Sequence, residues 1–227
     1  TTTLSMGQGT SLAGAFINHT GDLTLTSVSL AADSPLNIVS SGALNLPGAS
    51  IGTGTADLYL ESTGAGLSTS AALSTSTGTL SMIAGGGGIS IDHTVENTGA
   101  GTVFLSAAGP ISQTAAVSGG ELIAQTIGAG NALTLLDPGN NFATVSVRAV
   151  DAATPTAFVN SAVSYRDTDG FDQGNPDAFD SGTLGTLTFV AGGAMTDTGT
   201  IDAGVLDLTT DGGTTLDVGH TVDSFSA

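Results

Sequence analysis

The sequence predicts an all-β chain wound into a right-handed parallel β-helix, a solenoid of about ten coils. Three observations lead to this prediction. A short phrase, made of a small residue and an alternating apolar strand, returns along most of the chain. Glycine is abundant, with 34 residues, and it suits the corners where a chain turns between faces. No segment shows a sustained helical period.

The repeated phrase places an apolar residue two positions after its first small residue, as in "GDLTLTS" and "GTLSMIA". Its firm copies begin at Gly21, Gly42, Ala56, Gly78, Gly101, Gly120, Gly185 and Gly204. Looser copies begin at Asn131, Ala143 and Ser161. We expect each copy to form one strand with one face inward and one outward. The longest step between copies then contains the segment Tyr165–Gly182.

A second phrase lies between copies of the first, at residues 85–99, 107–120 and 191–204. Each coil is therefore expected to contain two or three short strands with glycine-rich corners. Such short strands are unstable alone, so coils must stack on one another. A β-sandwich of hairpins is the alternative, but it needs turns of about two to five residues, and the period here is longer. We expect a single domain over residues 1–227.

The charge of the chain limits its partners. Only Arg148 and Arg166 are basic, against 20 acidic residues, giving a net charge of −18. This excludes nucleic acid and anionic membrane surfaces, which need clusters of Lys and Arg, and makes divalent cations plausible companions. No apolar run is long enough to cross a bilayer. The lack of cysteine is typical of exported bacterial repeat proteins. Because the sequence begins at Thr1, we expect a processed form or an excerpt.

Residues 101–147, "GTVFLSAAGPISQTAAVSGGELIAQTIGAGNALTLLDPGNNFATVSV", carry a family resemblance. The GxLxL strands, the GxISQT turn and the NALTLLDPGNNFATVSV stretch resemble repeats of filamentous-haemagglutinin-type exoproteins and autotransporter passengers of Gram-negative bacteria. The resemblance covers roughly Gly21 to Asp217. It implies a right-handed parallel β-helix, export across the outer membrane, and a role in adhesion or surface structure. It supplies no catalytic residues.

The segment Tyr165–Gly182 is the strongest candidate site, because it contains five aspartates and one of the two arginines. Calcium binds six to eight oxygen atoms, largely from carboxylates and carbonyls. The calcium hypothesis assigns the metal to Asp167, Asp169, Asp172 and Asp177. The spacing does not match an EF-hand loop, so the site would be of another kind. The alternative is a solvated polar loop inserted around residues 165–182, in which Arg166 pairs with a nearby aspartate.

Other activities are weighed against the residue inventory. Asp167 and Asp169 could form a glycosidase pair on one strand face, but the chain has no Trp or Lys to bind a sugar. The three histidines, His19, His93 and His220, show no metal-ligand spacing. The alternating Ser and Thr residues of segment 67–80 raise an ice-binding alternative, but they do not recur coil after coil. We expect no enzymatic activity and no required cofactor.

These observations predict a structural protein of the extracellular space or the cell surface. We expect an adhesin shaft or the building block of a surface filament, acting as a stiff stack of coils. Unpaired strand edges at the ends of a solenoid invite another chain. The expected partners are therefore further copies joined end to end, or further repeats of a longer protein. The second class of function is a calcium-binding or host-glycan-binding module on the same scaffold.

Overall fold

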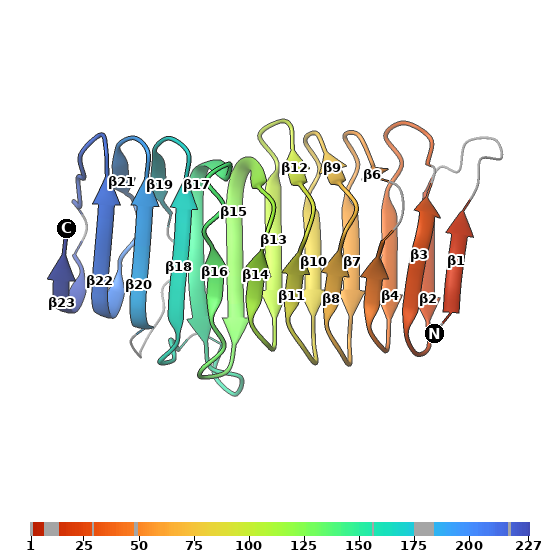
Figure 1. Cartoon of the computed structure of the whole chain (residues 1–227), viewed down its shortest axis with the longest axis horizontal. Helices are drawn as coiled ribbons and strands as arrows, with labels where there is room; N and C mark the ends of the chain where they lie inside the picture. Colours follow the sequence, from red (N-terminus) through yellow and green to blue (C-terminus); the bar gives the residue numbers. More distant parts are fainter. Residues whose placement is uncertain are drawn as a thin grey trace.

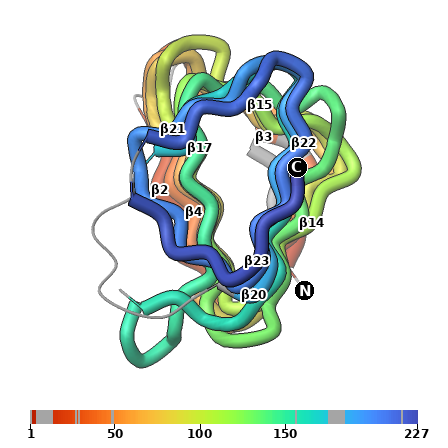
Figure 2. Tube along the Cα trace, turned by 90° about the vertical axis from the view of Figure 1, so that its left-hand side faces the viewer, coloured from red at the N-terminus to blue at the C-terminus, as the bar shows by residue number. Residues whose placement is uncertain are grey.

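The computed structural model describes residues 2–6, 14–28, 30–47, 50–155, 157–174, 184–217 and 219–227. The described residues form 23 strands and no helix. Every pairing between two strands is parallel, and the chain winds into a β-solenoid of about nine turns, close to the expected ten. Viewed along its axis, successive turns overlap as a single ring (Figure 2). The described residues contain no helix long and apolar enough to span a membrane.

One wall of the solenoid is a sheet of 11 strands, which we call the front sheet (Figure 1). In pairing order its strands are β1 (Thr2–Met6), β3 (Leu23–Val28), β5 (Leu44–Leu46), β8 (Leu67–Thr69), β11 (Ile89–Ile91), β14 (Ile111–Gln113), β16 (Leu133–Leu135), β18 (Ala162–Asp167), β20 (Leu184–Ala191), β22 (Asp202–Thr210) and β23 (Thr221–Ser226).

The second sheet has 12 strands and forms the rest of the wall. Its first row, which we call the back row, is β2 (Ala15–His19), β4 (Leu36–Ser40), β7 (Leu58–Ser62), β10 (Leu80–Ala84), β13 (Thr102–Ala107), β15 (Val117–Ile127) and β17 (Asn141–Val150). Its other row is β6 (Ile51–Gly52), β9 (Leu73–Thr75), β12 (Val95–Asn97), β19 (Phe171–Gln173) and β21 (Met195–Asp197). The two rows join because β15 is long enough to pair with both β12 and β13.

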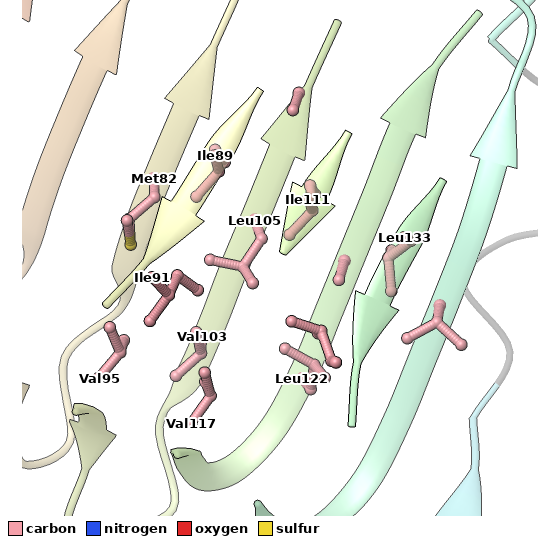
Figure 3. Close-up of a cluster of buried hydrophobic side chains, with 14 of the residues drawn as sticks. Met82, Ile89, Ile91, Val95, Val103, Leu105, Ile111, Val117, Leu122 and Leu133 are labelled. Atoms are coloured by element: carbon pink, nitrogen blue, oxygen red, sulfur yellow. The ribbon is translucent and has the colours of Figure 1, made fainter. Parts of the chain in front are cut away.

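The core fills the inside of the ring. Within the short strands, buried residues alternate with partly exposed ones, as a strand with one buried face requires. The inward side chains stack in columns along the axis; one column of fully buried residues is Leu58, Leu80, Val103, Leu122 and Val145. Side chains from the opposite walls meet between these columns (Figure 3). This one continuous core holds the coils together.

Buried polar side chains satisfy the backbone at the corners, where strand pairing stops. Asn97 donates to the carbonyl of Gly78 at 2.6 Å and accepts from the amide of Gly101 at 3.1 Å. Asn140 accepts from the amide of Val117 at 2.9 Å and donates to the carbonyl of Leu135 at 3.2 Å. A buried backbone group without a partner is costly, so these side chains make the corners possible.

The repeated phrase does not stay on one wall. Leu44 begins its strand in the front sheet, whereas Leu58, the next copy, lies in the back row. The phrase returns to the front sheet between Val145 and Val163. The irregular steps in the sequence mark these changes of wall. Each wall needs the same inward apolar pattern, so the phrase alone cannot identify the wall.

This change of wall alters which step between neighbouring strands is the longest. On the front sheet the longest step runs from Leu133 to Val163, which are neighbours in register. It contains the segment that follows β17, where Val150 and Phe158 form an antiparallel bridge. In Figure 2 this segment projects from the ring as a teal loop. Within the expected insertion at 165–182, Tyr165–Gln173 belongs to the wall of the solenoid. Residues 175–183 lie outside the described part, so an insertion there stays a prediction.

Candidate functional site

The structure divides the aspartate-rich segment between a strand, a corner and a second strand. Asp167 is the last residue of β18, Asp169 lies in the exposed corner that follows, and Asp172 lies in β19. Asp177 and Asp180 lie outside the described residues. The three described carboxylates therefore occupy three structural environments, although they lie close together in the sequence.

Asp167 points into the solenoid and is 1% exposed. Its Oδ2 atom accepts a hydrogen bond from the backbone amide of Phe142 at 3.0 Å and another from the hydroxyl of Tyr165. Its Oδ1 atom accepts from the amide of Asp169 at 3.1 Å. Burial raises the pKa of the Asp167 carboxyl to about 6, although the hydrogen bond from Tyr165 opposes the rise. This carboxyl joins neighbouring coils at a corner, as Asn140 does nearby.

Tyr165 is fully buried beside an aromatic cluster. Its ring meets that of Phe171 edge to face at 5.3 Å between centroids, and Phe171 meets Phe189 at 5.3 Å. Burial, together with the neighbouring carboxyl of Asp167, raises the pKa of the Tyr165 hydroxyl well above its usual value. The hydroxyl therefore stays protonated and remains a hydrogen-bond donor.

Asp172 points outward from β19, opposite to its buried neighbours Phe171 and Gln173. Its carboxylate accepts hydrogen bonds from the hydroxyl groups of Thr196 and Thr198 in the next coil, at 3.0 and 2.7 Å. Asp167 and Asp172 thus lie on opposite sides of the wall. Each carboxylate is used to join coils.

The structure shows where three of the four aspartates of the calcium hypothesis lie. Asp167 faces the core, Asp169 lies at the corner, Asp172 faces outward, and Asp177 is outside the described residues. Among the described residues, no three His, Cys, Asp or Glu side chains are grouped as a metal site requires. A calcium site that uses Asp177 stays a prediction. The glycosidase alternative loses its premise, because β18 ends at Asp167 and the two carboxyls share no exposed strand face.

Arg166 lies outside the wall, next to a cleft of about 500 Å³. The cleft is lined by Pro138, Arg166, Asp167, Thr168, Val190, Ala191, Gly192, Thr209 and Asp211. Within the described part of the chain, Arg166 forms no ion pair with any aspartate. The expected pairing with a neighbouring carboxylate is therefore not found there.

The three histidines lie in separate parts of the fold, and one of them makes a contact that the sequence did not predict. His220 Nε2 lies 2.9 Å from Asp197 Oδ2, and its Nδ1 atom accepts from the amide of Ile201 at 2.9 Å. Asp197 also accepts from the amide of Asp217 at 2.7 Å. Together these contacts fasten the segment before β23 to the preceding coil.

The outer surface of the back row carries a groove of about 470 Å³ across β2, β4, β7 and β10. It is lined by Phe16, Pro35, Leu36, Asn37, Asp57, Leu58, Tyr59, Thr79 and Ser81. Phe16 is 77% exposed, the largest exposure among the large hydrophobic side chains that the structure describes. Sequence reasoning missed this surface because its residues come from separate coils.

Comparison with protein-family models, curated proteins and solved structures gives no significant match. The solenoid is compatible with the β-helix repeats that the sequence resembles. Membership of the haemagglutinin and autotransporter group stays a prediction.

Proposed function

We propose that this chain is a structural protein of the extracellular space or cell surface, either an adhesin shaft or the building block of a filament. The observation that carries the proposal is the unbroken pairing of parallel strands from β1 to β23 along one axis. With adjacent strands about 4.8 Å apart, nine turns give a rod of roughly 43 Å. A stack with one continuous core resists bending and local opening.

The outermost strands support association along the same axis. In the front sheet β1 and β23 each have one neighbour among the described strands. An unpaired strand edge accepts a further strand, from a second molecule or from the same polypeptide where it continues. The net charge of −18 opposes the approach of two copies, so divalent cations would favour assembly.

The proposed role is not enzymatic and requires no cofactor. The carboxylates of Asp167 and Asp172 serve as hydrogen-bond acceptors between coils, which is a structural task. Nucleic acid is not part of the proposal, because phosphate contacts require basic clusters and this chain has two arginines. Membrane insertion is not part of it either, because the sequence has no apolar run long enough to cross a bilayer. The proposal includes export from a Gram-negative bacterium, because the repeats resemble those of exported proteins from such bacteria.

Two electron-microscopy experiments test the proposal. Immunogold labelling of producing cells should place the chain on the surface or on projecting fibres, and labelling confined to the cell interior would contradict it. Negative-stain images of the purified chain, with and without calcium or magnesium, test the filament version. Fibres growing along the solenoid axis are expected. Single particles at every concentration, confirmed by light scattering, would leave only the shaft version.

A further inference from the structure

One column of outward residues on the back row alternates between aromatic and polar side chains. The strand register aligns Phe16 with Asn37, Asn37 with Tyr59, Tyr59 with Ser81, and Ser81 with Phe104. We call these five residues the aromatic column. They lie on β2, β4, β7, β10 and β13, which are consecutive strands of the row. An aromatic ring thus occurs on every second coil.

The column faces away from the core. Tyr59 lies between Leu58 and Leu60, which are both 0% exposed, so strand alternation directs its ring outward. Phe16 is 77% exposed. Neighbouring strands are about 4.8 Å apart, so aromatic residues on every second strand repeat at about 9.6 Å along the axis.

The polar positions of the column are free to bind a ligand. The side chains of Asn37 and Ser81 form no hydrogen bond with any residue that the structure describes, and both line the groove. The amide of Asn37 offers donors and an acceptor, and the hydroxyl of Ser81 offers one of each. A groove with apolar surfaces and a few free polar groups is the usual form of a ligand site.

We propose that the aromatic column binds an extended β-1,4-linked glycan that carries no acidic groups. Such a chain is a flat ribbon that repeats every two sugar rings, and its repeat is close to the spacing between the aromatic residues. Each aromatic ring would meet the apolar face of every second sugar, while Asn37 and Ser81 bind hydroxyl groups of the sugars between them. The strand register fixes the spacing of the aromatic residues, and this spacing matches the two-sugar repeat when the glycan lies parallel to the solenoid axis.

The charge around the column decides which glycans are accepted. Asp57 lines the groove, and Glu61 accepts a hydrogen bond from the Tyr59 hydroxyl at 2.7 Å. No basic residue lines the groove. Uronate or sulfated chains would meet uncompensated carboxylates and the net charge of −18. The accepted ligands are therefore neutral chains, of the cellulose or chitin type.

The proposal is tested by calorimetric titration of the purified chain with cellohexaose and with the hexamer of N-acetylglucosamine. Maltohexaose, whose α-1,4 linkages curve the chain, is the ligand control, and an oligouronate is the charge control. We expect binding of at least one β-1,4-linked hexamer and none of either control. Comparing the affinities for the two β-1,4-linked hexamers shows whether the ligand is of the cellulose type or of the chitin type.

Variants locate the site. Tyr59→Ala and Phe16→Ala should each weaken binding about tenfold. Phe225→Ala is the matched control, since Phe225 is 58% exposed but lies on β23 in the front sheet. It should leave affinity unchanged. The double variant Tyr59→Ser with Ser81→Tyr keeps the number of aromatic residues but breaks their spacing, and it should bind as weakly as Tyr59→Ala.

The melting temperature of each variant is measured first, and Phe16→Ala provides the test if Tyr59 variants do not fold. The proposal would be overturned if neither β-1,4-linked hexamer binds or if maltohexaose binds equally well. It would also be overturned if Phe225→Ala loses as much affinity as Tyr59→Ala, or if the double variant Tyr59→Ser with Ser81→Tyr keeps full affinity.

Discussion

The hydroxyl of Tyr165 donates a hydrogen bond to the Oδ2 atom of Asp167, and both side chains lie inside the solenoid. The same oxygen accepts a hydrogen bond from the backbone amide of Phe142, which lies in β17 of the other sheet. The carboxyl of Asp167 is therefore a buried link between coils.

Asp167 should make stability depend on pH. Burial raises its pKa from 3.8 to about 6, so the folded state holds the proton more tightly than the unfolded state. The resulting stabilisation is fully present below pH of about 4 and is lost as the pH rises through about 6. Because the other acids also titrate, urea denaturation from pH 4 to 7 is compared with Asp167→Asn. The variant should lack this component, and parallel pH profiles would contradict the prediction.

Tyr165→Phe should destabilise the protein by about 1–3 kcal/mol, because it removes a donor from a buried carboxyl. It should also raise the pKa of Asp167 further, since the hydrogen bond from Tyr165 lowers that pKa. Tyr59→Phe is the control: its hydroxyl binds Glu61 at a partly exposed position, and its loss should cost below about 1 kcal/mol. Equal decreases in the free energy of unfolding, measured by urea denaturation, would show that burial does not distinguish the Tyr165–Asp167 pair from the Tyr59–Glu61 pair.

Gly86→Ala should destabilise the stack by about 1–3 kcal/mol through overpacking at a corner. A Cβ atom at Gly86 would lie 2.3 Å from the carbonyl oxygen of Gly64 in the preceding coil. Gly219→Ala is the control, because nothing lies within 4 Å of its Cβ position. Thermal denaturation of both variants provides the comparison. An unchanged melting temperature in Gly86→Ala would mean that the backbone at this corner can move apart without loss of stability.

His220→Ala should loosen the last strand selectively. It removes the contacts with Asp197 and with the amide of Ile201 that hold the segment before β23. We expect faster amide hydrogen exchange in Thr221–Ser226 and little change in the central coils, because each coil contacts only its neighbours. His93→Ala, at an exposed corner, should leave exchange in β23 unchanged. Uniformly faster exchange would indicate a global effect instead.

The sequence was sufficient to predict the architecture, because inward leucines at every second position are the direct requirement of a stacked wall. It could not predict the wall to which each strand belongs. Leu44 and Leu58 stand in the same phrase, yet they lie on different sheets. The small residue, the alternation and the following turn are the same on every wall, so only the pairing register distinguishes them.

The candidate site was harder to predict for a related reason. Asp167 and Asp169 share one face only if the strand continues, and the corner begins between them. Asn97 and Asn140 look like ordinary turn residues, although their side chains satisfy the backbone of other coils. The aromatic column joins Phe16, Tyr59 and Phe104, which become neighbours only once the register is known.

The register also makes the length of the rod adjustable in units. Leu58, Leu80 and Val103 occupy equivalent places in three successive coils. Excising residues 80–102 would bring Val103 into the place of Leu80, so the coils on either side could join without a change of phase. The rod would shorten by about 4.8 Å, one strand spacing. Insertion or loss of whole coils therefore changes the length of the solenoid in fixed increments and leaves the remaining coils in register.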